Sequence, residues 1–481
     1  MLQRFRESLS LILIAVLPIH ALLVTMTTHM LQGQHHAPLV IIALWKEVLL
    51  AVLVVLVLIE IVRMKESELQ HSVWKLDMLD WSIVLAVALG ITVSLLHGAG
   101  SSFGHLSLVD KQFLFGFKYD FLPLVVFLFL RRVPWSRNFM VVAARTIVMI
   151  GIVAALFGIL TLFLPLEFFT SIGYSDLHSL YLPNAAIASF QFLEGTQIRR
   201  IQSFMSGPNQ FGLWLLLPLA ANLLLFVKSF REHRRMDSFL YVGGEILIIT
   251  ALFLTYSRSA WIGAAVIVCI FFILLLRHYL ASVFRRTLVV AGVCLLTCFA
   301  IVVGVYVSPH ILVRTQSFKG HVEKPLAALQ IIRAHPFGLG LGTAGPASNR
   351  LSDACVFFDI GADFSWAANH KNFCVFIGGI QKLPADNACD CPLLTENWYV
   401  QWGVEMGIAG LFLSLAIVVI VLVYGFRFPT NDLRMVPVLA FLGVAVGGIF
   451  LHAFEDGAVA YSLWLLLSAS RLTLEPETSG S

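Results

Sequence analysis

The sequence has few charged residues, and this lack excludes most soluble folds. Asp, Glu, Lys and Arg make up 12% of the 481 residues, whereas hydrophobic residues make up 59%. Soluble domains contain about 25% charged and about 45–50% apolar residues. The net charge of +4 is small and spread along the chain, which argues against a nucleic-acid partner. We therefore predict an integral membrane protein.

Long apolar runs take the place of the missing charge. They are continuous rather than alternating, which favours a helical bundle over a membrane barrel. Because a span needs about 20 apolar residues, the pattern predicts an all-α polytopic membrane protein with about 12 transmembrane helices. The first run is expected to be a retained span rather than a cleaved signal. The predicted spans lie at about 9–27, 38–62, 79–97, 112–130, 141–164, 207–228, 239–256, 259–276, 287–307, 397–425, 435–453 and 457–470.

The positions of Lys and Arg predict the orientation of these spans. With a cytoplasmic N-terminus, eighteen of them fall on the cytoplasmic side, and the other side holds four outside its one long loop. Cytoplasmic loops are enriched in Lys and Arg, so both termini are expected in the cytoplasm. Segments 165–206 and 308–395 are then expected on the outer side. This divides the chain into spans 1–9 (1–307), a large outer loop between spans 9 and 10 (308–395), and spans 10–12 with a short cytoplasmic tail (396–481).

The outer loop is long enough to form a folded cap with its own short helices. Residues 322–334 have helical apolar spacing, and Pro336 breaks the pattern. The glycine-rich stretch 338–346 lacks the spacing of a nucleotide-binding loop and a buried strand before it. We expect it to be a compact turn.

Cysteine is scarce, and its positions agree with this topology. Two disulfides are expected in an oxidising compartment. Cys389 and Cys391 are too close in sequence to favour a bond between them, so each should pair with one of the other two. A zinc site with His370 and Asp390 is the alternative, but paired CxxC spacing is absent. Four of the seven cysteines lie in the outer loop: Cys355, Cys374, Cys389 and Cys391.

Three polar stretches lie at the outer ends of predicted spans: 199–212, 255–261 and 395–410. Each stretch by itself fits an interfacial belt of arginines and aromatic residues. All three are expected on the same side of the membrane. We therefore infer that they form one site.

The residue types in these stretches suit an anionic, lipid-linked ligand. Arg200 and Arg258 carry forked donors that match a pyrophosphate. Residues 206–209 resemble a helix start, whose amides add affinity for anions. Glu396, and Glu405 deeper in its span, would place carboxylates opposite the arginines. The same pocket could therefore hold a general base.

The order of these motifs resembles that of a known superfamily. An arginine precedes Gly207-Pro208-Asn209, a Ser-Arg turn follows, and a later span begins Asn397-x-x-x-Gln401-x-x-x-Glu405-x-Gly-x-x-Gly. With the twelve-span layout and the long late loop, this resembles the O-antigen ligase and O-antigen polymerase superfamily of bacterial membrane glycosyltransferases.

The resemblance implies an enzyme of the bacterial inner membrane whose active site faces the periplasm. It would transfer a glycan from undecaprenyl diphosphate to a hydroxyl of a lipid, a protein or another glycan, without a metal or another cofactor. Arg200 and Arg258 would grip the diphosphate, and Glu396 would act as the base. Further substrate contacts are expected from Arg199, Ser206, Asn209, Ser257, Asn397, Gln401, Glu405 and Lys118.

The chain departs from the superfamily at one position. Many members have a histidine at the start of the third motif, where this chain has Glu396. A carboxylate can accept the proton if partial burial raises its pKa. His321, His335 and His370 are the alternative bases.

Charged residues within the apolar runs leave a second class of function open. An unpaired charge in a span costs about 2.5 to 3.5 kcal/mol on insertion scales. Lys46, Glu47, Lys118 and Asp120 are therefore expected to be paired across helices, while Lys118 or Lys46 could extend the diphosphate site. A transporter of lipid-linked glycans would also use such charges. Ligase ranks ahead of polymerase because the cap leaves room for a bulky acceptor.

Overall fold

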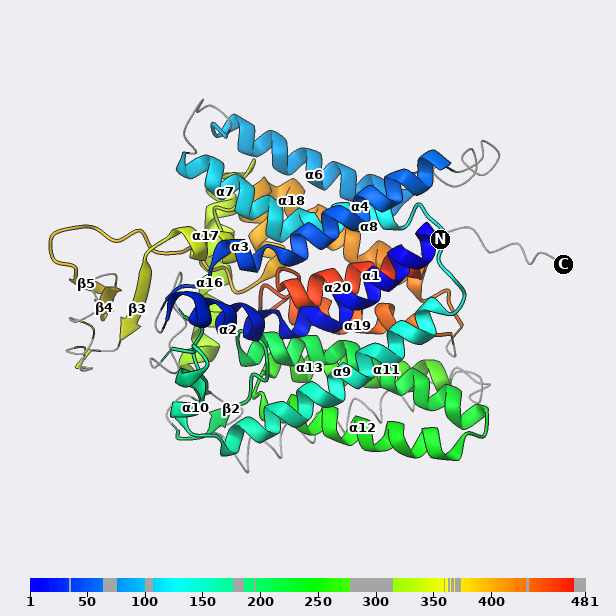
Figure 1. Cartoon of the computed structure of the whole chain (residues 1–481). Coiled ribbons are helices and arrows are strands. Elements are labelled where there is room, and N and C mark those ends of the chain that lie inside the picture. Colours follow the sequence, from blue (N-terminus) through cyan, green and yellow to red (C-terminus); the bar gives the residue numbers. More distant parts are fainter. Residues whose placement is uncertain are drawn as a thin grey trace, which may run out of the picture.

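The computed structural model describes most of the chain as one bundle of helices (Figure 1). The ninth predicted span, 287–307, and the tail after 470 lie outside the described residues. The described residues are 1–33, 36–63, 76–99, 107–175, 186–193, 196–276, 315–358, 360–361, 364, 367, 373–429 and 432–470.

Eight helices of the described residues are long and apolar enough to cross a membrane. The chain is therefore a helical membrane protein, as its composition predicts. Three more segments of the bundle are shorter or carry more charge: α3–α4 (Val40–Ala43 and Trp45–Arg63), α19 (Met435–Gly447) and α20 (Gly457–Ala469). The eight are α1-η1-α2 (Leu2–Val16, Leu17–Ile19, His20–Gln32), α6 (Met78–Leu96), α7-η2-α8 (Leu108–Gly116, Phe117–Phe121, Leu122–Leu130), α9-η3 (Phe139–Leu160, Thr161–Phe163), α11 (Pro208–Arg231), α12 (Arg235–Leu254), α13 (Arg258–Leu276) and α18 (Trp398–Gly425).

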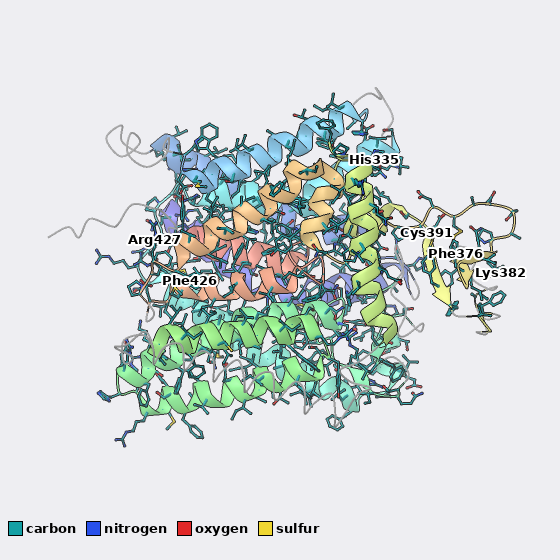
Figure 2. All side chains as sticks on the ribbon, turned by 180° about the vertical axis from the view of Figure 1, so that it is seen from behind. His335, Phe376, Lys382, Cys391, Phe426 and Arg427 are labelled. Carbon is teal, nitrogen blue, oxygen red and sulfur yellow. A yellow bond between two sulfur atoms is a disulfide. The ribbon has the colours of Figure 1, made fainter. Side chains whose placement is uncertain are left out.

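The two segments predicted to share one side do lie at the same end of the bundle. Segment 165–206 contributes α10 (Leu166–Ser171) and the short strands β1 (Gln191–Phe192) and β2 (Arg199–Arg200). Segment 308–395 contributes α16 (Thr315–Ala334) and α17 (Gly345–Leu351) next to them (Figure 1). We call this the cap end. Phe426 and Arg427 mark the opposite end (Figure 2).

Cations at the opposite end are partly neutralised by carboxylates that are buried or partly buried. Arg131 binds Asp77 at 2.7 Å and Asp80 at 2.6 Å, and Arg6 binds Glu60 at 3.1 Å. These pairs join α1 to α4, and α6 to the end of α8. Removing one partner of such a pair would leave a charge buried and uncompensated.

The cap contains a small sheet that the sequence analysis did not predict. Strand β3 (Ala354–Phe358) is parallel to β4 (Phe373–Ile377), which is antiparallel to β5 (Ile380–Leu383). The sheet lies beyond α16 and α17 and points away from the bundle (Figure 1). The predicted helix in the cap is present as α16.

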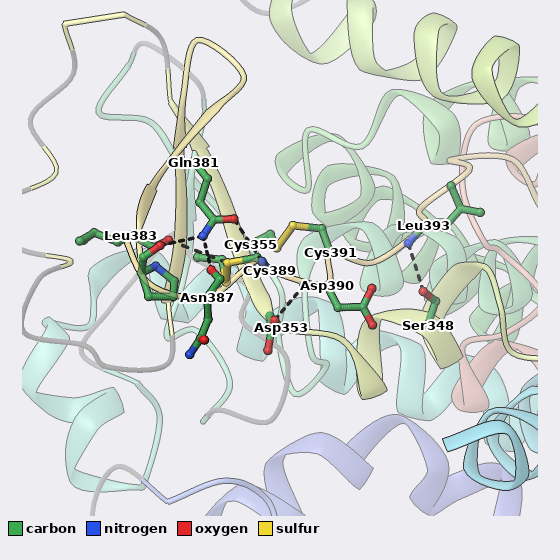
Figure 3. Close-up of a disulfide and its surroundings, with 12 residues drawn as sticks. Ser348, Asp353, Cys355, Gln381, Leu383, Asn387, Cys389, Asp390, Cys391 and Leu393 are labelled. Carbon is green, nitrogen blue, oxygen red and sulfur yellow. Dashed lines mark hydrogen bonds between the residues drawn. A yellow bond between two sulfur atoms is a disulfide. The ribbon is translucent and has the colours of Figure 1, made fainter. Parts of the chain in front are cut away.

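Two disulfides fasten the sheet to the chain that leads into α18 (Figure 3). The bonds are Cys355–Cys391 and Cys374–Cys389, which confirms the predicted pairing rule. Cys355 and Cys374 are direct neighbours on β3 and β4. Residues two apart on an extended chain lie on the same side, so Cys389 and Cys391 can each reach a different strand. These bonds occupy the thiolates that a zinc site would need, and His370 lies outside the described residues.

Thiol labelling checks the two disulfides. In the purified protein, denatured without reductant, Cys355, Cys374, Cys389 and Cys391 are expected not to react with maleimide, and all four should react after reduction. Mass spectrometry of the labelled peptides counts and locates the adducts. Replacing Cys355 and Cys391 together by serine should lower the stability of the cap by about 2–5 kcal/mol. Free labelling of Cys374 or Cys389 before reduction would contradict the pairing.

Candidate functional site

A cavity of about 550 Å³ opens at the cap end, where segments far apart in the sequence meet. Its wall is formed by the start of α2, the first turn of α4, η2, the start of α11, α17 and the loop that precedes α20. Apolar residues such as Leu17, Val24 and Leu213 form part of the lining. The polar residues of the lining include His20, Lys46, Lys118, Tyr119, Gln191, Ser206, Asn209, Arg350, Glu396, His452, Glu455 and Asp456.

Five residues that the sequence analysis selected line this cavity. They are Ser206 and Asn209 from the first motif, Glu396 from the third motif, and Lys46 and Lys118 from apolar runs. The structure therefore brings the first and third motifs together around one space. The other selected residues are not among the described lining residues.

Arg200 lies directly behind the cavity wall. Its side chain is buried and donates from Nε to the Thr255 carbonyl at 2.9 Å, which ties the first motif to the second. Its Nη2 donates to Asn209 Oδ1 at 2.8 Å, and its Nη1 to Gln191 Oε1 at 3.3 Å. Because Asn209 and Gln191 both line the cavity, the positive charge of Arg200 is one side chain away from it.

Arg199 has a different environment from its neighbour. Its Nη1 donates to the carbonyls of Thr161 at 2.9 Å and Leu164 at 2.7 Å. Its guanidinium lies 4.0 Å from the centre of the Phe190 ring. Successive side chains of a strand point to opposite sides, and Arg199 and Arg200 form β2. The strand therefore places the guanidinium groups of the two arginines in different surroundings.

The second motif supports the start of α11. A Cβ atom on Gly212 would lie 2.9 Å from the Ala260 side chain and 3.2 Å from that of Ser257. The Ser257 hydroxyl is buried 3.2 Å from the Ser259 hydroxyl. Arg258 is the first residue of α13. The turn thus packs against α11 next to the residues that line the cavity.

Each of the three motifs contains one non-glycine residue in the left-handed region. The φ angles are 52° at Ser203, 50° at Tyr256 and 51° at Glu396. Among the described residues only His233, in the turn between α11 and α12, shares this conformation. Such backbone costs about 1–3 kcal/mol, persists only where its surroundings hold it, and is frequent at functional sites.

The start of α11 is an open position for an anion. Its N-cap is Gly207, and no side chain caps it within the described structure. Asn209 and Gln210, in its first turn, line the cavity. The partial positive charge of a helix start binds anions, phosphates included. The start of α20 differs, because the Asp456 carboxylate already accepts from the amides of Ala458 and Val459.

Lys46 and Lys118 form a charged cluster on another wall. Lys118 Nζ is 2.8 Å and Lys46 Nζ is 3.4 Å from Glu47 Oε1. The predicted pairing across helices is therefore confirmed for Lys118 and Glu47. Lys118 lies in the π-helical turn η2, a type of turn that occurs often at functional sites. Asp120, also in η2, instead accepts from Trp402 Nε1 at 3.0 Å.

Glu396 is held in an ion pair at the cavity edge. Its Oε1 is 2.9 Å from Lys324 Nζ, and its Oε2 is 3.7 Å from His321 Nδ1. Burial alone would raise the pKa of Glu396, but the charge of Lys324 and the nearby histidines outweigh it, and the pKa is lowered. This shift is opposite to the one that Glu396 needs to become a stronger base. His335 directly follows the last residue of α16 and is exposed, and His370 lies outside the described residues.

His452 is a cavity residue that the sequence analysis missed. It belongs to the loop between α19 and α20, and its Nδ1 lies 2.5 Å from Gln401 Oε1 of the third motif. Its Nε2 is buried without a hydrogen-bond partner in the described structure. Burial, only partly opposed by the charge of Glu396, lowers the pKa of His452 to about 4. The polar residues His452, Glu455 and Asp456 lie between two apolar runs, and they were the signal available in the sequence.

Glu405 and Asn397, both selected from the third motif, have structural contacts. Glu405 is fully buried, and its Oε1 accepts from the amides of Gly342 at 2.9 Å and Ala344 at 3.4 Å. Gly342 has a φ of 77°, and a Cβ atom there would lie 2.0 Å from the Gln112 carbonyl oxygen. The glycine-rich stretch is thus a compact turn, as predicted. Asn397 caps α18 by accepting from the Val400 amide at 2.9 Å.

In comparisons with known proteins, no protein-family model and no curated protein matches the chain. The resemblance to the O-antigen ligase superfamily therefore stays a hypothesis that depends on the three motifs.

Proposed function

We propose that this protein is a membrane glycosyltransferase that transfers a glycan from undecaprenyl diphosphate to an acceptor hydroxyl, in the manner of an O-antigen ligase. The observation that carries the proposal is the cavity itself. It joins the uncapped start of α11, which suits a phosphate, to His452, whose imidazole suits proton transfer, and to Glu396. Motifs separated by nearly 200 positions thereby share one reaction space.

The diphosphate is proposed to bind at the start of α11. Ser206 and Asn209 lie at this start, and the buried Arg200 adds positive charge from behind. Lys118 faces the same space from η2. Arg258, in the turn that Arg200 binds, is proposed to contribute further charge. Fixed positive groups of this kind stabilise the charge that develops on a leaving diphosphate.

The lipid and the acceptor are proposed to approach from different sides. The apolar lining from Leu17, Pro18 and Val24 suits the first isoprene units of the donor. The acceptor would enter from the cap, past α17 and Glu396. A cap of this size leaves room for a lipid or protein acceptor, whereas a polymerase would place a second lipid-linked glycan there. In this proposal the cap end faces the periplasm of a bacterial inner membrane.

A negative charge added at the start of α11 tests the diphosphate position. Asn209→Asp keeps an oxygen that accepts from Arg200 but adds a negative charge where the diphosphate is proposed to lie. We expect undecaprenyl diphosphate to bind the purified protein more tightly than uncharged undecaprenol. We expect Asn209→Asp to weaken diphosphate binding by about tenfold or more, because like charges repel. Native mass spectrometry with both lipids measures this preference.

The matched control is Asn349→Asp, which makes the same change on the α17 wall of the cavity. It should alter diphosphate binding less than Asn209→Asp does. Equal binding of the two lipids by the unmodified protein would refute a diphosphate site here. Equal effects of the two variants on diphosphate binding would show that the diphosphate does not bind at the start of α11.

Proteoliposomes distinguish a transferase from a transporter. The protein is supplied with a glycan on undecaprenyl diphosphate and with an acceptor, in the presence of EDTA. We expect a new glycosidic product and released undecaprenyl diphosphate. Movement of the donor across the bilayer without product would favour a transporter, and loss of activity with EDTA would favour a metal-dependent transferase.

A further inference from the structure

His452 has the contacts of a residue that accepts a proton from a ligand in the cavity. Gln401 Oε1 can only accept a hydrogen bond, so Nδ1 of His452 carries the hydrogen in this contact. The neutral ring then has its lone pair on Nε2. That nitrogen is buried and has no hydrogen-bond partner in the described structure.

The other histidine in the described cavity lining lacks these properties. His20 Nδ1 accepts from Trp45 Nε1 at 2.9 Å, and its Nε2 is 2.9 Å from Lys46 Nζ. Both ring nitrogens of His20 are therefore occupied. Glu396 is also occupied, because its carboxylate is paired with Lys324 at 2.9 Å.

We infer that His452, rather than Glu396, removes the proton from the acceptor hydroxyl, through its Nε2. This inference rests on the proposed glycan transfer. The acceptor oxygen forms a bond to the anomeric carbon while the bond from that carbon to the diphosphate oxygen breaks. The diphosphate leaves with the electron pair, and the hydroxyl proton ends on Nε2. Gln401 keeps the Nδ1 hydrogen bond throughout and so positions the ring.

The charges around His452 support its assignment, in place of Glu396, as the base. Glu396, which precedes α18, favours the imidazolium form, whereas Lys324 of α16 disfavours it. Glu455 lies in the same loop as His452, and burial followed by the charge of Asp120 raises its pKa well above the ordinary value. The other ionisable groups of the cavity lining are Lys46, Lys118, Arg350, Asp456, Tyr119, Tyr461 and His20.

The ligand itself would make His452 a better base. With a pKa of about 4, the ring is neutral at neutral pH and its lone pair is available. A bound diphosphate adds negative charge to the cavity, and nearby negative charge raises the pKa of a histidine. Diphosphate binding therefore raises the pKa of His452 toward the working pH. A general base is most effective when its pKa lies near that pH.

Two substitutions and a small molecule test the role of His452. In proteoliposomes, His452→Ala is expected to lower the transfer rate by about 100-fold to 10,000-fold, the range for loss of a general base. Added imidazole should restore part of this rate, which a merely structural role would not predict. Binding of undecaprenyl diphosphate should remain within threefold of the unmodified protein. His452→Gln, which keeps a donor for Gln401, provides a second variant if the alanine variant does not fold.

The comparison with Glu396→Gln decides between the two bases. Removing the negative charge of Glu396 should lower the transfer rate by about tenfold or less. Added imidazole should not restore this rate. It should also move the acidic limb of the rate profile to lower pH, because the pKa of His452 falls when a nearby negative charge is lost. A loss of 100-fold or more in Glu396→Gln, with near-normal transfer in His452→Ala, would overturn the inference and return the role to Glu396.

Failure of the proposed function gives a different result. In that case the unmodified protein neither prefers undecaprenyl diphosphate nor forms product, and the inference on His452 fails with it. A protein that binds and transfers normally but tolerates His452→Ala and His452→Gln overturns the inference on His452 alone.

Discussion

Replacing Arg200 by alanine is expected to lower glycan transfer by at least about 100-fold, whereas Arg199→Ala retains it. Arg200 contacts both Asn209 and Gln191 on the cavity wall and holds the second motif through Thr255. Loss of a fixed cation at a developing negative charge has an effect of about 100-fold to 1,000-fold. Arg199 contacts only the carbonyls and the ring behind β2 in the bonds described above.

The adjacent arginines make a matched pair of variants. Transfer from the lipid-linked donor is measured in proteoliposomes with equal amounts of each inserted variant. Arg200→Lys should recover only part of the activity, because a point charge does not replace a planar fork of donors. We expect Arg258→Ala to resemble Arg200→Ala. Equal activity of Arg199→Ala and Arg200→Ala would show that Arg200 is not part of the diphosphate site.

Replacing Glu405 by alanine is expected to destabilise the protein by about 3 kcal/mol, because each buried amide left without a partner costs about 1–3 kcal/mol. Two amides of the glycine-rich turn, those of Gly342 and Ala344, donate to this carboxylate. The turn also contacts α7 at Gln112, so its loosening would reach the neighbouring helix. Glu405→Gln retains an accepting oxygen and should cost less.

Unfolding of the purified variants in detergent, followed by intrinsic fluorescence, measures these differences. The matched control is Glu232→Ala, which removes an exposed carboxylate that is 3.1 Å from Arg234 at the opposite end. An exposed ion pair contributes about 0–1 kcal/mol, so this variant should behave like the unmodified protein. If Glu405→Ala is as stable as Glu232→Ala, Glu405 is not needed to hold the turn.

The sequence by itself determined the class of the protein and several local features. Low charge and continuous apolar runs require a helical membrane bundle, because backbone groups in a bilayer must be paired within each segment. The spacing of Cys389 and Cys391 disfavoured a bond between them, and the structure pairs each with a strand. The helix start at Pro208 and the compact turn around Gly342 were also readable, because proline, glycine and their neighbours restrict the local backbone.

Only the tertiary structure decided which polar residues meet in the cavity. His452 and Gln401 are 51 positions apart, and Glu405 and Gly342 are 63 apart. No local sequence pattern indicates that two residues so far apart in the chain are in contact. The third motif illustrates the limit: Glu396 lines the cavity, Gln401 positions a histidine, and Glu405 holds a turn. Residues of one helix share a sequence pattern, but their neighbours are set by the packing of other helices against each face.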